Sequence, residues 1–321
     1  MEESSNNVRP DIVSYLTELN THANKGDVIN ARLLYDRMYC LSSSKHRRPE
    51  QLLRPTTALA NKLIHAYARV SPNDSNASAE AQEILESMLR DDDNDDYFPP
   101  PNLVSFCSVV NAWAHSTVPD KVRRARVVLR EEIRFRNRSE DDDDDRLLRN
   151  AHNMTLDACA FADPRRFAET LRTAVDVLES LSQSSNSSSV GPDATSYATF
   201  FRVYENVGDD VKDDVKDDVD LLASDAFRSC RERGLVDARV WKRFRRASST
   251  ELLRRTLIPV TGVRAVFGGE ERRRRRRMGS SKSIEDDELI STTTTTATKS
   301  PYDYGVEDLP SEWRRNVKNE Q

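Results

Sequence analysis

Residues 10–38 read PDIVSYLTELNTHANKGDVINARLLYDRM, and their pattern predicts two short helices joined by a tight turn. In the first helix, the apolar residues at helical spacing are Val13, Leu16, Leu19 and Ala23. Gly26 then suits a left-handed helix end, and Asp27 can cap the next helix. The second helix, near residues 28–39, has an apolar face made of Val28, Ala31, Leu34, Tyr35 and Met38. One such hairpin cannot bury its own apolar face, so the stretch predicts neighbours of the same kind.

Variants of this hairpin recur along the chain, with an aromatic residue early in helix one and a small alanine in helix two. The clearest pairs are Tyr15 with Ala31, Phe106 with Ala125, and Tyr197 with Ala223. A further copy spans residues 57–88, and a weaker one lies near residues 150–181; their matching residues are Ala81 and Met88, then Ala174 and Leu181. Five copies of one helical hairpin predict an all-α fold, a right-handed α-solenoid of about five degenerate repeats.

This pattern divides the chain into three parts. Residues 1–9 form an N-terminal extension, residues 10–249 the repeats, and residues 250–321 a mostly disordered, basic and low-complexity tail. The units lie near residues 11–45, 56–90, 102–138, 149–182 and 193–236, and a capping helix with Trp241 and Phe244 follows. The tail holds a hexa-arginine block at 272–277 and ends in a short helix that can dock through Trp313, with Ser311 as its cap.

The strings that open three units resemble those of the pentatricopeptide repeat family, whose unit is a helical hairpin of about 35 residues. They are Pro10-Asp11-Ile12-Val13-Ser14-Tyr15, Pro101-Asn102-Leu103-Val104-Ser105-Phe106 and Pro192-Asp193-Ala194-Thr195-Ser196-Tyr197. Gly234-Leu235-Val236-Asp237 resembles the end of a unit. The resemblance covers roughly residues 10–240. The tetratricopeptide repeat, a protein-binding relative, is disfavoured because its Trp-Leu-Gly-Tyr signature is missing from every unit.

The resemblance implies single-stranded RNA binding, in which each unit reads one base with two or three side chains. The family's reading positions are the residue after the early aromatic of helix one and the last residue of the unit. Here they are Leu16 with Thr56, Asn61 with Asn102, Cys107 alone, Asn153 with Asp193, and Ala198 with Asp237. In the family, Asn with Asn suggests cytosine first among the pyrimidines, and Asn with Asp suggests uridine.

Three of these five positions do not suit a base-by-base code. The side chains of Leu16, Cys107 and Ala198 cannot hydrogen-bond a base edge in the usual way. The alternative for Asn61 and Asn153 is that they only stabilise helix starts. Five units also cover only about five bases, too few for tight selective binding by themselves.

Charge is distributed unevenly along the chain. Three acidic runs, 91–96, 140–145 and 209–220, contain 5, 6 and 7 acidic residues and two lysines, a net charge of −16. The whole chain carries −5, so the remainder carries +11. We expect these runs to be disordered inserts and the repeat body to be basic enough for RNA. In the capping helix, the candidate contacts to the RNA backbone are Lys242, Arg243, Arg245 and Arg246.

Other classes of protein find less support in the sequence. The deaminase strings His-x-Glu and Pro-Cys-x-x-Cys and the usual phosphate-loop and hydrolase motifs do not occur, so we expect no catalysis, cofactor or metal. The four cysteines lack ligand spacing and are expected to be small buried residues. No apolar run is long enough for a membrane span, and no small-molecule substrate is evident. A protein-binding α-solenoid scaffold remains the alternative function.

The resemblance implies a role in mitochondrial or plastid RNA processing, stability or translation, with other RNA-processing proteins as further partners. The first residues, MEESSNNVRPD, show no transit peptide. Since a unit begins at Asp11, we expect either further sequence upstream or a family member that works in a different compartment.

Overall fold

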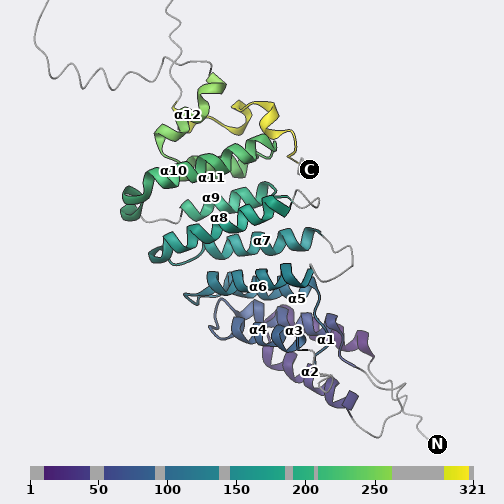
Figure 1. Cartoon of the computed structure of the whole chain (residues 1–321). Coiled ribbons are helices and arrows are strands. Elements are labelled where there is room, and N and C mark those ends of the chain that lie inside the picture. The colour runs from purple at the N-terminus through teal and green to yellow at the C-terminus, as the bar shows by residue number, and fades with distance from the viewer. Residues whose placement is uncertain are drawn as a thin grey trace, which may run out of the picture. The chain divides into compact units, whose positions relative to one another are not determined.

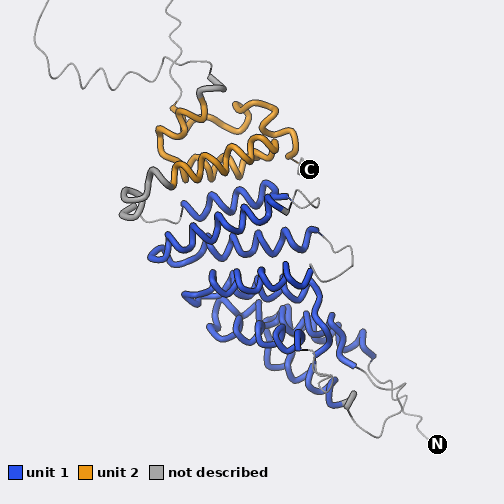
Figure 2. Tube along the Cα trace, viewed as in Figure 1, with its two compact units in different colours: residues 1–212 blue, residues 213–321 orange. Residues whose placement is uncertain are grey.

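The computed structural model describes residues 11–43, 54–90, 98–136, 145–184, 191–205, 209–261 and 300–317. These residues form twelve α-helices and several 3-10 turns, and the described ranges contain no strand, which confirms the all-α prediction (Figure 1). The chain divides into two compact units, residues 1–212 and residues 213–321 (Figure 2). Each unit is described by itself below.

Unit 1 is a series of helices joined by short turns. Its helices are α1 (Ile12–Lys25), α2 (Val28–Ser43), α3 (Thr57–Val70), α4 (Ala77–Met88), α5 (Leu103–His115), α6 (Lys121–Arg136), α7 (Asp145–Ala160), α8 (Phe167–Ser184) and α9 (Ala194–Glu205). A 3-10 turn, η2 (Pro164–Arg166), precedes α8. The next helix, α10 (Asp209–Glu232), contains the boundary between the two units.

The odd-numbered helices of unit 1 pack on one another in chain order, α1 on α3, α3 on α5, α5 on α7 and α7 on α9. Each even-numbered helix packs on the odd helix before it and on the odd helix after it. The positions that repeat in the sequence form this core. The aromatics Tyr15, Phe106 and Tyr197 are buried, and so are the alanines Ala31, Ala81, Ala125 and Ala174. The fifth repeated alanine, Ala223, is buried within unit 2.

The first hairpin shows how local sequence makes these elements. Asp11 caps α1 by accepting a hydrogen bond from the backbone N–H of Ser14 at 2.8 Å. Gly26 ends α1 in the left-handed region, with a φ of +71°, and its N–H donates to the carbonyl of Ala23. Asp27 accepts from the N–H of Asn30 and so caps α2.

Two details of this hairpin differ from the prediction. The buried residues of α1 are Tyr15, Leu19 and Ala23, each four positions from the last, whereas Val13 is 66% exposed. Cys40 is also exposed, although we expected a buried residue. It follows Met38 by two positions, which places it about 200° further round the helix than that buried methionine.

The acidic run 209–220 was expected to be a disordered insert, and this prediction is wrong. It forms the first half of α10. The physical reason is visible in its sequence, where valine recurs every fourth residue at 211, 215 and 219, the spacing of one helix face. The run 91–96 and residues 140–144 lie outside the described residues.

Unit 2 contains the rest of α10, then α11 (Ala238–Ala247) and α12 (Thr250–Thr261), and three 3-10 turns. These turns are η3 (Pro301–Asp303), η4 (Val306–Asp308) and η5 (Ser311–Arg314). Phe227 of α10 stacks on Phe244 of α11, with ring centroids 3.9 Å apart. Trp241 and Trp313 contact the same Phe227 ring, and all four aromatic residues are buried.

The prediction assigned residues 250–321 to a mostly disordered tail. In the structure, residues 250–261 are helical and residues 300–317 pack in unit 2, while residues 262–299 lie outside the described residues. The 3-10 turn η5 starts after Pro310, so Ser311 lies inside this turn and does not cap it. The buried Trp313 explains why this part of the tail is ordered, since its ring packs against Phe227.

Candidate nucleic-acid interface

Asn61 and Asn102, which the sequence pairs as reading positions, contact each other in the structure. Asn61 lies on α3 and Asn102 is the N-cap of α5. The Asn61 amide nitrogen donates to the Asn102 side-chain oxygen at 3.1 Å. The Ser105 hydroxyl donates to the Asn61 side-chain oxygen at 2.6 Å. These three residues, Asn61, Asn102 and Ser105, are called cluster 1 below.

The backbone fixes the orientation of every polar group in cluster 1. The N–H of Ser105 donates to the Asn102 side-chain oxygen at 3.2 Å, so the Asn102 amide nitrogen must face away from Ser105. The N–H of Asn102 donates to the Ser105 hydroxyl, so this hydroxyl donates onward to Asn61. Among the described residues, the Asn102 amide nitrogen has no hydrogen bond. Cluster 1 therefore presents a donor on an exposed residue.

The same arrangement recurs two hairpins further along the chain, between α7 and α9. The Asn153 amide nitrogen donates to the Asp193 carboxylate at 3.5 Å, and the Ser196 hydroxyl donates to the Asn153 side-chain oxygen at 2.7 Å. The N–H of Ser196 donates to the same carboxylate at 2.8 Å. These residues are called cluster 2. Its N-cap is an aspartate, so it presents an acceptor where cluster 1 presents a donor.

A second contact also repeats beside each cluster. Thr57, four residues before Asn61, donates to the carbonyl of Pro100 at 3.0 Å. Arg149, four residues before Asn153, donates to the carbonyl of Gly191 at 3.5 Å. The Arg149 guanidinium also lies 3.7 Å from the Asp193 carboxylate. Both clusters thus have a side chain, four residues before the first asparagine, that binds the carbonyl two residues before the N-cap. At cluster 2 this side chain is Arg149, which adds a positive charge.

Ser105 and Ser196 were not among the predicted site residues, although they complete both clusters. Their signal was present in the sequence, because Asn102 and Asp193 are each followed three residues later by serine. Asp11 and Ser14 share this spacing, and the Asp11 carboxylate accepts from both the N–H and the hydroxyl of Ser14. Asn or Asp with Ser at this spacing is a capping arrangement, in which each residue binds the backbone of the other.

The other predicted pairs do not form such clusters. Thr56 caps α3 through the N–H of Leu59, and Leu16 is half-buried on α1. The Cys107 thiol donates to the carbonyl of Leu147 at 3.2 Å and is buried. Ala198 is half-buried in unit 1. Asp237, in unit 2, caps α11 by accepting from the N–H of Val240 at 2.7 Å.

The four basic residues predicted to contact the RNA backbone lie on α11, in unequal positions. Lys242 and Arg246 are exposed one helical turn apart, and Arg243 is half-buried. The Arg245 guanidinium donates to the carbonyl of Tyr304 at 3.0 Å. Of these four, Lys242 and Arg246 are therefore the two that are both exposed and on the same helix face.

A buried acid lies behind Cys107. Glu132 of α6 is fully buried, and its Oε2 atom has no hydrogen-bond partner among the described residues. Burial raises the pKa of Glu132 to about 8, against smaller opposing effects of the Cys107 thiol and Arg136. Its Oε1 atom lies 3.8 Å from the Cys107 sulfur. Cys107, the predicted reading position of this unit, is thus a buried thiol that faces the protonated carboxyl group of Glu132.

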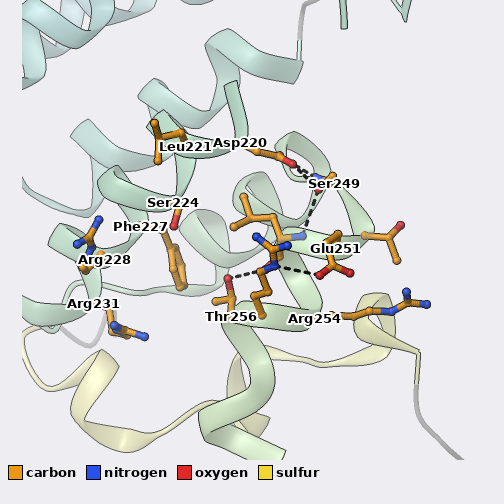
Figure 3. Close-up of a pocket in the computed structure, with 13 residues that line it drawn as sticks. Asp220, Leu221, Ser224, Phe227, Arg228, Arg231, Ser249, Glu251, Arg254 and Thr256 are labelled. Carbon is orange, nitrogen blue, oxygen red and sulfur yellow. Dashed lines mark hydrogen bonds and ion pairs between the residues drawn. The ribbon is translucent and has the colours of Figure 1, made fainter. Parts of the chain in front are cut away.

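The described part of unit 2 also contains an open cavity of 760 Å³ between α10 and α12 (Figure 3). Two acidic side chains of its lining are hydrogen-bonded to other lining residues. The Asp220 carboxylate accepts from the backbone N–H of Ser249 at 3.2 Å, and the Arg255 guanidinium donates to Glu251 at 2.9 Å. The carboxylates of both acidic residues in its lining, Asp220 and Glu251, are therefore already hydrogen-bonded.

We compared the chain with protein-family models, with curated proteins and with solved structures, and none of these comparisons found a match. Over the described ranges, no helix has the length and apolar character needed to span a membrane. The same residues contain no group of three or more His, Cys, Asp or Glu side chains placed to hold a metal ion.

Proposed function

We propose that this chain is a degenerate helical-repeat protein of the pentatricopeptide type, whose hairpins stack as a right-handed solenoid and bind single-stranded RNA without catalysis. The observation that carries the proposal is the recurrence of one hydrogen-bonded cluster at two helix junctions, on the residue pairs that the family resemblance names. The sequential packing of the odd-numbered helices supports the stacked arrangement.

The chemistry of the two clusters matches two different pyrimidines. Cytosine has an acceptor at N3, which the free amide nitrogen of Asn102 can bind. Uracil has an N–H donor at N3, which the Asp193 carboxylate can bind. In both clusters, the first asparagine keeps a second amide hydrogen that can donate to the O2 atom common to both bases. The proposed preference is therefore cytosine at cluster 1 and uridine at cluster 2.

The exposure of the clusters is compatible with this role. Asn102 is exposed, and the Asp193 side chain is 41% exposed. Asn61 is only 9% exposed, and its amide forms hydrogen bonds with Asn102 and Ser105. Each first asparagine then orients the second residue, and the second residue makes the main contact with the base.

The biological role that we propose is occupancy of an organellar transcript, in its processing, stability or translation. Exposed Lys242 and Arg246 would add contacts to the phosphate backbone.

The proposal is tested by selecting short RNAs from a random single-stranded pool with the purified full chain, at low and moderate salt. The Asn61→Ala/Asn153→Ala double variant should lose the enriched sequence, whereas Asn30→Ala, at an exposed amide outside both clusters, should keep it.

Two exchanges test the chemistry of base recognition directly. Asp193→Asn should move the preference at one position from uridine to cytosine, and Asn102→Asp should do the reverse at another. Each mismatched base should weaken binding by roughly 1–3 kcal/mol.

Two results would contradict base reading. Binding that ignores sequence and all four substitutions, and disappears as salt rises, would reduce the function to a basic surface. Failure to bind at either salt would remove RNA altogether and leave the protein-binding scaffold.

A further inference from the structure

Residues 300–317, called the strap below, contain local hydrogen bonds in addition to their contacts with the helices of unit 2. Ser300 and Asp303 cap each other across η3, with the N–H of Ser300 donating to the Asp303 carboxylate at 3.1 Å. The N–H of Gly305 donates to the Asp308 carboxylate at 2.7 Å, and the N–H of Trp313 to the carbonyl of Pro310 at 3.0 Å. Part of the conformation of the strap is therefore specified by residues within the strap itself.

The strap binds the C-terminal end of α10 through hydrogen bonds that depend little on side-chain identity in that helix. Arg315 and Asn316 donate from their side chains to the carbonyls of Glu232 and Arg233, at 2.8 and 2.6 Å. The N–H of Asn316 donates to the carbonyl of Gly234 at 2.9 Å, and the Trp313 carbonyl accepts from the N–H of Val236 at 2.9 Å. Carbonyls at a helix end lack partners within the helix, so they form a ready acceptor site.

Gly234 makes this close approach possible. Its φ of +68° lies in the left-handed region, and a Cβ atom there would stand 2.4 Å from the Cγ atom of Arg315. A side chain at this position would therefore collide with the bound strap.

The strap also contacts α11 through an indole and a guanidinium. The Trp241 Nε1 atom donates to the carbonyl of Tyr304 at 2.8 Å, and Arg245 binds the same carbonyl. The Trp313 ring meets Phe227 edge-on at 5.8 Å and lies under the Arg231 guanidinium at 5.1 Å. Peptide-binding sites also combine a buried aromatic anchor with hydrogen bonds to main-chain atoms.

The connection to the strap does not force it onto its own chain. Thirty-eight residues separate Thr261 from Ser300. A segment of this length can span up to about 125 Å, enough to reach a neighbouring molecule. Exchange of an identical element between copies is a low-cost route to a dimer, since both states make the same contacts.

We propose that the surface formed by the end of α10 and by α11 is a peptide-docking site, filled reversibly by the strap, and that its occupant in trans is the strap of a second copy of this chain. The inference does not depend on RNA binding. It assigns to unit 2 a self-association function that is regulated by concentration, because the strap on the same chain competes with the strap of a neighbour.

The site is tested with the full chain carrying a protease cleavage sequence inserted after residue 280. After cleavage, the strap fragment should exchange with a fluorescent peptide of residues 300–317, giving saturable binding that unlabelled peptide reverses. A peptide with Trp313→Ala should bind at least tenfold more weakly, whereas one with Glu307→Gln, at an exposed position, should bind as the native peptide does. Trp241→Phe in the protein should weaken binding several-fold while keeping an aromatic ring in the core.

The second copy is tested with uncut chains that carry two different affinity tags. Mixed at high concentration, they should co-purify, and excess strap peptide should separate them. A cleaved strap that never exchanges, or a peptide that does not bind, would refute the docking site. Chains that stay monomeric at every concentration would refute the second copy as its occupant.

Discussion

Replacing Glu132 by methionine should raise the free energy of unfolding at pH 7. The gain should be small at pH 5 and grow as the pH rises. Glu132 is fully buried, and burial raises its pKa from 4.5 to about 8. The folded state therefore holds this proton over a pH range in which the unfolded chain has lost it. Stability is greatest below the unfolded pKa, falls as the pH rises, and becomes constant above the folded pKa.

The size of the effect follows from these two pKa values. Each unit of pH between them costs about 1.4 kcal/mol, so at pH 7 the wild-type protein is destabilised by roughly 3 kcal/mol relative to a neutral side chain. Methionine has a similar length, no charge and a flexible chain that can fill the space. Between pH 5 and pH 7, the difference in unfolding free energy between variant and wild type should grow by about 2.5 kcal/mol.

The assay is urea unfolding at pH 5, 6, 7 and 8, followed by circular dichroism. Glu131→Gln is the matched control, since Glu131 is the next residue on the same helix but its side chain is 46% exposed and pairs with Arg134. This control removes a surface carboxylate from the same helix and leaves the buried carboxyl of Glu132 in place. If the difference between Glu132→Met and wild type were the same at all four pH values, Glu132 would be ionised in the folded protein, and the argument from burial would be wrong.

Three further outcomes test the fold. Gly26→Ala should destabilise the protein by about 1–2 kcal/mol in thermal unfolding, because it strains a left-handed residue that packs near Val70; an unchanged midpoint would contradict this. Ser105→Ala should cost about 1–3 kcal/mol through the lost contacts of cluster 1, whereas Ser108→Ala, whose hydroxyl binds only its own helix at Val104, should cost much less in the same assay. Under native conditions, a thiol reagent should modify Cys40, with mass spectrometry showing protection of the buried residues Cys107, Cys159 and Cys230. Burial raises the pKa of the Cys159 thiol to about 12, so its labelling before unfolding would refute the described packing.

The sequence by itself determined the features that act within one or two helical turns. The spacing of apolar residues placed Leu19, Ala23 and Ala31 in the core, and the recurrence of the hairpin pointed to Tyr15. Gly26 marked the end of the first helix. These signals could be read because helix periodicity and capping depend on residues only three or four positions apart. The run 209–220 has valine at the same period of four, but its aspartates dominate the composition and favour the prediction of a disordered segment.

Only the tertiary structure decided which distant groups meet. Ser105 reaches Asn61 across 44 positions, and Asn316 reaches Arg233 across 83. Whether Glu132 is solvated or buried likewise depends on the helices packed around it, since neighbouring Glu131 has the same chemistry and is half-exposed. Local patterns specify a helix and its buried face, but hydrogen bonds between helices, and the pKa of a buried acid, arise only when packing brings the helices together and removes water.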